Sequence, residues 1–234
     1  MDSGHGGSII GDLQTIWSGL DWSKLTGILI SVIPALLCIT FHELCHGLVA
    51  YRLGDNTAKD AGRLTLNPIK HLDLIGLLMM AVAHFGWAKP VPINMNNFKN
   101  PKRGMAITAL AGPVSNLMLS IAFLFIFGLL YYPLYNAGSA AGILLQMLYQ
   151  TAYLSCALAV FNIIPLPPLD GSKVFFSFLP DNLYYKLMYY ERYGMIILLV
   201  IVAAGVFTSF LTSGTEWVFN GLFGVARWAS SLVA

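Results

Sequence analysis

Long runs of apolar residues dominate the chain. Runs long enough to cross about 30 Å of hydrocarbon occur four times, at residues 25–51, 104–133, 140–163 and 193–213. Two further stretches are ambiguous, since 72–87 is short for a span and 216–234 carries Arg227. Each is compatible with a short, tilted, re-entrant or interfacial helix. The pattern predicts an all-α polytopic membrane protein, a bundle of four to six transmembrane helices.

The rest of the apolar pattern indicates one domain spanning residues 1–234. Residues 1–24 place Leu13, Ile16, Trp17 and Leu20 at helical spacing among polar neighbours, which predicts an interfacial N-terminal segment. We expect a catalytic core over residues 25–175 and C-terminal helices over 176–234. The chain shows no linker or internal repeat between these parts.

Two stretches in the basic region between the first two spans suggest extended backbone. They read GRLTLN at residues 62–67 and KPVPIN at 89–94. Pro90 and Pro92 lack the N–H group that a central strand needs, so the second stretch is expected at an edge. An unpaired strand edge cannot face lipid. We therefore predict short membrane-associated β strands or a hairpin that lie at the interface, pair together, or pair with an incoming segment.

Composition and charge place these elements in a membrane. Hydrophobic residues make up 57% of the chain and charged residues 10%, far below the roughly 25% of a soluble domain. No basic stripe offers a surface for nucleic acid, so the expected partners are the lipid bilayer and other membrane proteins. Most basic residues fall between the first and second spans or between the third and fourth. Both regions are therefore predicted to be cytoplasmic.

Three ionisable residues interrupt the end of the first predicted span. His42 and His46 stand four residues apart in HELCH, so on a helix they project from one face, which suits two imidazoles on one metal ion. Glu43 follows the first histidine, as in H-E-x-x-H zinc hydrolases, where the glutamate is not a ligand but moves the proton of an activated water. Polar contacts between helices are the alternative interpretation. Because ionisable groups in hydrocarbon are costly, a functional site is favoured.

A catalytic zinc ion needs a third protein ligand and one open position. The best candidate is Asp170 in NIIPLPPLDGSKV, the only carboxylate in a long apolar context after the third span. The prolines at 165, 167 and 168 stop the preceding helix, and irregular backbone at membrane depth is tolerated where it lines a wet cavity. The alternative is a helix stop at the cytoplasmic surface, followed by a turn at Gly171.

The two motifs HELCH and NIIPLPPLDG together resemble those of the site-2 protease family of intramembrane zinc metalloproteases. The resemblance extends to NPIKHLD at 67–73, FGWAKPVPIN at 85–94 and AGPVSN at 111–116. It implies one catalytic Zn²⁺ on His42, His46 and Asp170, with Glu43 as the general base. No inserted PDZ or CBS-like domain is evident, so the chain is similar to a compact member of the family.

The same resemblance suggests roles for three further polar residues. Asn162 matches the motif asparagine, whose amide would donate to the developing oxyanion, although a hydrogen bond between helices explains it equally well. Asn116 is expected to brace the helix kinked near Gly112 and Pro113. His71 is expected to cap or orient the segment that follows it. Asn116 and His71 are thus candidates for supporting roles.

The implied function is hydrolysis of peptide bonds within or next to the transmembrane segments of membrane protein substrates. The protein would be a multi-pass enzyme of the cell membrane, with its active site nearer the cytoplasmic side. A membrane metal transporter is one alternative, but it would not need Glu43 beside the first ligand. A catalytically silent relative that binds membrane proteins is another.

The distribution of basic residues yields a prediction about topology. Cysteines introduced at Lys59 and Lys102 in a cysteine-free background should react with a membrane-impermeant thiol reagent from the cytoplasmic side, because both positions lie in the basic region. A cysteine at Asn136, in the uncharged loop after the second span, should react from the opposite side. Labelling of all three from one face would contradict the assignment.

Overall fold

The computed structural model describes residues 22–73, 75–76 and 88–233. Their secondary structure is helical, with short connections. The longer helices are α2 (Trp22–Arg52), α5 (Pro101–Leu134), α6 (Ser139–Asn162), α8 (Asp181–Tyr190), α9 (Gly194–Ala203) and α10 (Val206–Ser230). Shorter elements are α3 (Thr57–Asp60), η1 (Pro68–His71), η2 (Met95–Asn97), α7 (Asp170–Phe176) and η3 (Glu191–Tyr193).

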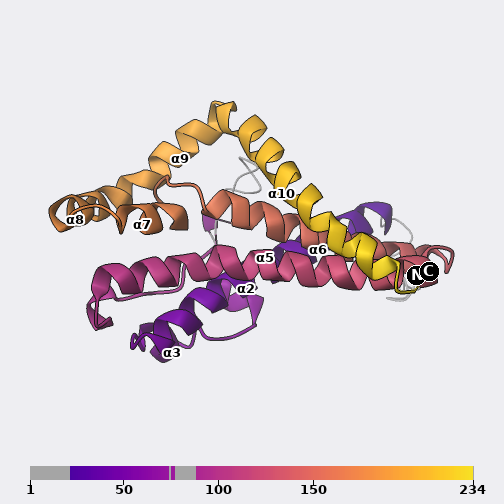
Figure 1. Ribbon diagram of the computed structural model, residues 1–234, viewed down its shortest axis with the longest axis horizontal. Helices are drawn as coiled ribbons and strands as arrows, with labels where there is room; N and C mark the ends of the chain where they lie inside the picture. Colours follow the sequence, from indigo (N-terminus) through magenta and orange to yellow (C-terminus); the bar gives the residue numbers. More distant parts are fainter. Residues whose placement is uncertain (1–21, 74, 77–87, 234) are drawn as a thin grey trace, which may run out of the picture.

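Three of the described helices are long and apolar enough to cross a membrane, which makes the chain an integral membrane protein. They cover Ile30–Arg52 of α2, Pro101–Leu134 and Ser139–Asn162, and they match the first three predicted spans. The all-α polytopic fold class is therefore confirmed. In Figure 1, α5 runs the length of the molecule beside α6, and α2 packs against both of them.

Small and weakly polar side chains let these three helices approach closely. The surface that α5 buries includes Ala109, Gly112, Ser115, Asn116 and Ser120, and that of α6 includes Ala152, Ser155 and Ala159. Ser155 Oγ of α6 donates a hydrogen bond to the backbone oxygen of Asn116 at 2.8 Å. Helix association within a bilayer relies on such packing and on interhelical hydrogen bonds, because lipid removes the hydrophobic driving force.

The fourth predicted span, 193–213, is not a single helix. The chain turns at Gly205, which adopts a left-handed conformation with φ of 69°, and α9 and α10 meet there at a marked angle (Figure 1). A ten-residue helix such as α9 is about 15 Å long, half the thickness of the hydrocarbon. The ambiguous C-terminal stretch forms the second half of α10, where Phe219 and Ala226 pack against Leu124 of α5 and Cys156 of α6.

The predicted β strands are not formed. Among the described residues, the region between α3 and α5 contains one isolated antiparallel bridge, from Leu72 to Ala88. Residues 89–94 run without regular secondary structure, since Pro90 and Pro92 supply no N–H for a ladder. The predicted interfacial segment at 1–24 and the stretch at 72–87 fall largely outside the described residues.

The contact of α10 with α5 generates a prediction about stability. A Cβ atom on Gly128 of α5 would clash with the backbone oxygen of Ala226 on α10. We expect Gly128→Val to separate the two helices and to lower the free energy of unfolding by roughly 1–3 kcal/mol, the usual cost of overpacking.

The matched control is Gly142→Val on α6, where a Cβ would meet no atom within 4 Å. Unfolding in mixed detergent and dodecyl sulfate measures both variants. Equal stability of the two variants would mean that the close approach of α5 and α10 contributes nothing.

Candidate active site

The three predicted metal ligands lie together although they are far apart in the sequence. Helix α2 carries His42 and His46 one turn apart, and α7 begins at Asp170. The irregular stretch 163–169 brings α7 back against the end of α6. A Cβ on Gly171 would clash with the backbone oxygen of Ile163. Only glycine therefore lets α7 start close enough to α6 for Asp170 to reach the histidines.

The three side chains converge on one point. Asp170 Oδ2 lies 3.1 Å from His42 Nε2 and 3.0 Å from His46 Nε2, and the two Nε2 atoms are 3.0 Å apart. Two imidazole nitrogens and one carboxylate oxygen form a donor set that Zn²⁺ prefers. All three side chains are largely buried, with exposed fractions of 8%, 7% and 13%. They are therefore positioned to bind one metal ion.

The outer nitrogen of each imidazole also fits a metal site. His46 Nδ1 donates to the backbone oxygen of Thr108 at 2.7 Å, which leaves Nε2 with a lone pair for the metal. His42 Nδ1 lies 3.2 Å from the side-chain nitrogen of Asn116, whose Oδ1 is buried and has no partner among the described residues. Turning this amide by 180° brings its oxygen to Nδ1. His42 then donates from Nδ1 and keeps its Nε2 lone pair as well.

Helix α5 forms the floor of the metal site. A Cβ on Gly112 would clash with His42 Cε1 and His46 Nε2. Thr108 and Asn116, one turn to either side of Gly112, provide the contacts to the two imidazoles. The AGPVSN stretch thus contributes both the space for the imidazole rings and a hydrogen bond that orients one of them.

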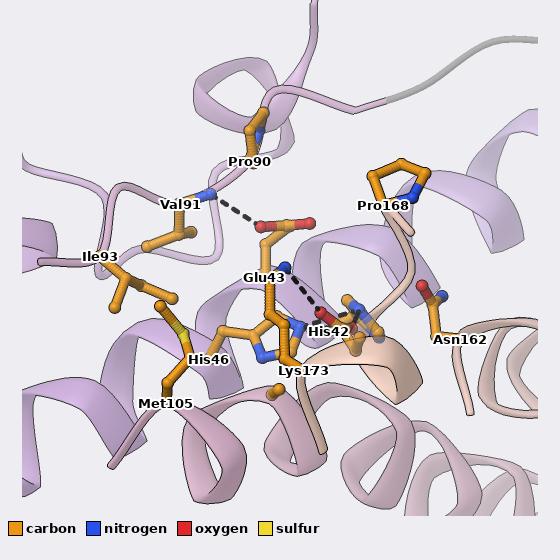
Figure 2. A pocket seen from close by; sticks show the side chains of 12 residues that line it. His42, Glu43, His46, Pro90, Val91, Ile93, Met105, Asn162, Pro168 and Lys173 are labelled. Atoms are coloured by element: carbon orange, nitrogen blue, oxygen red, sulfur yellow. Dashed lines mark hydrogen bonds and ion pairs between the residues drawn. The ribbon is translucent and has the colours of Figure 1, made fainter. Parts of the chain in front are cut away.

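A cavity of about 170 Å³ opens over these ligands. Glu43 lines it and accepts a hydrogen bond from the backbone N–H of Val91 at 2.9 Å (Figure 2). In the same view Asn162 lies on the other side of His42. The cavity therefore has the two ligand histidines at its base, a carboxylate beside them, and an amide opposite the 89–94 stretch.

The 89–94 stretch is held at both ends by buried polar groups. Arg63 donates to the backbone oxygen of Lys89 at 2.7 Å, and the N–H of Lys89 donates to the backbone oxygen of His71 at 2.9 Å. At the other end, Asp55 accepts from the N–H of Asn94 at 2.7 Å. These contacts fix the position of Val91, and so they position Glu43 through it.

Asp55 is ionised in this arrangement. Burial raises the pKa of its carboxyl group, but hydrogen bonds from Thr57, Asn94 and Asn97 outweigh burial and hold the pKa below its ordinary value. An anionic carboxylate accepts these bonds more strongly than a neutral group would. Asp55 therefore acts as an anchor between the end of α2 and the stretch that lines the cavity.

The remaining predicted residues, Asn116, Asn162 and His71, differ in their contacts with the site. Asn116 contacts His42 directly, and Asn162 lines the cavity while its amide donates to Leu158 O in the same helix at 3.0 Å. His71 is buried away from the ligands and donates to Thr65 O at 2.9 Å. It orders the loop beside the site and does not join the metal-binding cluster.

Sequence reasoning missed three contributors: the Thr108 carbonyl, the Val91 N–H and Lys173. Backbone groups leave no signature in side-chain identity, so the first two could not have been found. Lys173 could have been noticed, because it stands three residues after Asp170 and so shares its face on a helix. It lines the cavity and lies 3.2 Å from Glu191 Oε1.

Comparisons with known proteins agree with this geometry. The model of peptidase family M50 matches residues 131–203. The chain is 42% identical over 171 residues to a Bacillus subtilis (strain 168) protein named "Putative zinc metalloprotease YwhC", which covers 73% of this chain and 78% of the relative. No solved structure matches the chain.

More distant relatives are named "Putative zinc metalloprotease Rip2". The protein of Mycolicibacterium smegmatis is 27% identical over 199 residues, covering 83% of this chain and 74% of the relative. That of Mycobacterium tuberculosis (strain H37Rv) is 27% identical over 206 residues, covering 86% and 77%. Each match extends over most of both chains.

The contact at Gly112 generates a prediction about metal binding. Gly112→Ala leaves all three ligand side chains in place but puts a methyl group against both imidazoles, so we expect zinc retention on the purified protein to fall sharply. Gly214→Ala is the control, because a Cβ there meets only Val160, at an ordinary 3.6 Å. Full zinc retention in Gly112→Ala would mean that α5 does not shape the site.

Proposed function

Because this chain belongs to peptidase family M50, we propose that it is an intramembrane zinc endopeptidase that cleaves other membrane proteins within or next to their transmembrane segments. One observation carries the proposal. His42 Nε2, His46 Nε2 and Asp170 Oδ2 lie within 3.1 Å of one another at the base of a cavity that also contains Glu43. We assign the three as zinc ligands and Glu43 as the general base.

A zinc ion held by these residues would lower the pKa of a bound water and polarise the scissile carbonyl. Glu43 then accepts the proton of the attacking water and returns it to the leaving nitrogen. Its Oε2 is engaged by Val91 N–H, which orients the carboxylate and leaves Oε1 for the water. General acid–base assistance of this kind contributes about 10²- to 10⁴-fold to the rate.

Asn162 is assigned to the developing oxyanion. Its side-chain nitrogen has two hydrogens, of which one donates to Leu158 O, so the second is available on the cavity side. A neutral donor suits this position, because Lys173 already places one cation beside Asp170. Asn116 is assigned as a positioning residue that acts through His42.

Residues 89–94 are proposed to hold the substrate backbone. A helical substrate hides its carbonyl groups in its own hydrogen bonds, so it must unwind before attack. Successive residues of an extended chain point to opposite sides, and the N–H of Val91 points to the cavity. That N–H is already bonded to Glu43, so the donor proposed for the substrate is the N–H of Ile93, which is expected on the same side. Pro90 and Pro92 offer no donor. An unwound segment would therefore add to the cavity side of this stretch.

The basic residues suggest how the protein lies in the membrane. His46 and His42 precede Arg52 at the end of α2 by about 9 to 15 Å of helix. With the basic regions in the cytoplasm, the cavity would open within the cytoplasmic leaflet of the cell membrane. One domain, with its core at 25–175, would carry the whole site.

The position of Glu43 favours an enzyme over the two alternatives. A metal transporter gains nothing from a carboxylate that lines the cavity but stays outside the ligand cluster. A silent binding protein would not need the complete set of ligands, base and amide around one cavity. Both alternatives predict that membrane proteins remain intact.

The test compares Glu43→Gln with Asp170→Asn, both assayed on a single-span membrane protein that the wild-type chain cleaves. Glu43→Gln should keep its zinc, since no ligand has changed and the amide oxygen can still accept from Val91. Its cleavage rate should fall by about 10²- to 10⁴-fold. Asp170→Asn should lose zinc and cleavage together, because it removes the anionic oxygen that balances the cation.

Two results would count against the proposal. Appreciable turnover by Glu43→Gln would mean that another group activates the water. Loss of zinc from Glu43→Gln with the fold intact would make Glu43 a ligand and favour a metal-binding or transport site.

A further inference from the structure

Lys173 lies beside the metal-binding cluster and makes contacts that the proposed mechanism does not use. Its Nζ is 3.8 Å from Asp170 Oδ1 and 3.2 Å from Glu191 Oε1. The lysine comes from the middle of α7 and the glutamate from the start of η3. The side chains of Lys173 and Glu191 are only 20% and 21% exposed. The three groups form a row of alternating charge, of which Asp170 and Lys173 line the cavity.

The contacts of Asp170 divide its two oxygen atoms between different partners. Oδ2 faces both imidazoles, at 3.0 and 3.1 Å, and Oδ1 faces the Lys173 ammonium group. A carboxylate without such a contact is free to bring its second oxygen to a metal ion as well. The lysine therefore favours binding through Oδ2 alone.

Glu191 is a second carboxylate within reach of the site. The contacts of 3.2 and 3.8 Å at Lys173 Nζ together place Glu191 Oε1 within about 7 Å of Asp170 Oδ1. Carboxylates are ordinary zinc ligands, and a catalytic zinc ion must keep one position open for water or substrate. A glutamate at this distance competes with water and substrate for the open position unless another group holds its carboxylate.

We propose that Lys173 is a positioning residue that keeps the open position free, by holding both Asp170 Oδ1 and Glu191 away from the metal. This rests on the proposed function of the site. Glu191 has a matching effect on Lys173, because its negative charge offsets an ammonium group that would otherwise repel the ion. The pair thus shapes the site without adding net charge to it.

The proposal predicts opposite effects of two single substitutions on metal binding. Lys173→Met releases both carboxylate oxygens, so zinc should bind at least as tightly as in the wild type, through more oxygen ligands. Glu191→Gln leaves the ammonium charge uncompensated beside the site, so zinc affinity should fall, by about the 10- to 100-fold typical of partners that support metal ligands.

Cobalt(II) substitution reports the number of ligands directly. The purified wild-type protein with Co²⁺ alone should show the intense visible absorption of a four-coordinate ion. Lys173→Met should show the weaker absorption of a higher coordination number, and its cleavage rate should fall at least 10-fold. The double variant Lys173→Met/Glu191→Gln should regain much of the four-coordinate spectrum and of the cleavage. Lys173→Arg, which keeps the cation, should resemble the wild type.

Lys102→Met is the matched control. Lys102 pairs with Asp181 at 3.1 Å and is as buried as Lys173, although Asp181 is exposed, so its loss removes a lysine–carboxylate contact at the start of α5, away from the metal ligands. The Co²⁺ spectrum of this variant should equal that of the wild type. A change of spectrum here would trace the effects to general loss of structure and overturn the proposal.

Two further outcomes would overturn the proposal. If the lysine only braces the fold around Asp170, Lys173→Met loses its zinc, and such a loss contradicts the role assigned here. An unchanged Co²⁺ spectrum together with unchanged cleavage would do the same. The Co²⁺ spectra and the zinc affinities need no substrate, so they test the role of Lys173 whether or not the protein cleaves. Absence of cleavage by the wild-type protein would instead contradict the proposed protease function.

Discussion

A polar atom inside a hydrocarbon-embedded helix bundle needs a partner, and this requirement organises the structure. His42, His46 and Asp170 put two imidazoles and a carboxylate at one point, with distances of 3.0 to 3.1 Å between their inner atoms. The outer nitrogens of the imidazoles are used by Thr108 and Asn116 of α5. These contacts join α2, α5 and α7 at the site.

Close approach of the helices is the condition for this convergence, and small residues supply it. Gly112 leaves space for the two imidazole rings, and Gly171 lets α7 start against the end of α6. Gly128, in the other half of α5, leaves space for α10 to approach closely. In a bilayer, where apolar contact alone gives little preference for one neighbour over another, such steric matching selects the packing.

The sequence could predict those features that depend on periodicity or on the cost of burying polar groups. The i, i+4 spacing of His42 and His46 places them on one helix face, and the proline-rich break before Asp170 marks a second polar element at membrane depth. The three long spans follow from hydropathy in the same way. All of these are local signals, and the structure has each of them.

The parts that could not be predicted depend on backbone conformation or on contacts across the fold. Hydropathy counts residues 193–213 as one span, because it cannot register that Gly205 turns the chain. The extended character of 89–94 suggested strands, but its partners are Glu43, Asp55 and Arg63, so side chains replace the expected ladder. The pairing of Lys173 with Glu191 joins α7 and η3, and no spacing in the sequence predicts that these two elements lie close together.

The distance along the chain between the ligands has a consequence for biosynthesis. His42 and His46 precede Asp170 by 128 and 124 residues, and a chain entering the membrane from its N-terminus inserts α2 long before α7 exists. During that interval the two imidazoles have no carboxylate beside them, and a zinc ion would lack its third ligand. A nascent chain can therefore assemble the metal-binding cluster only after α7 has been synthesised and has packed against α2 and α5.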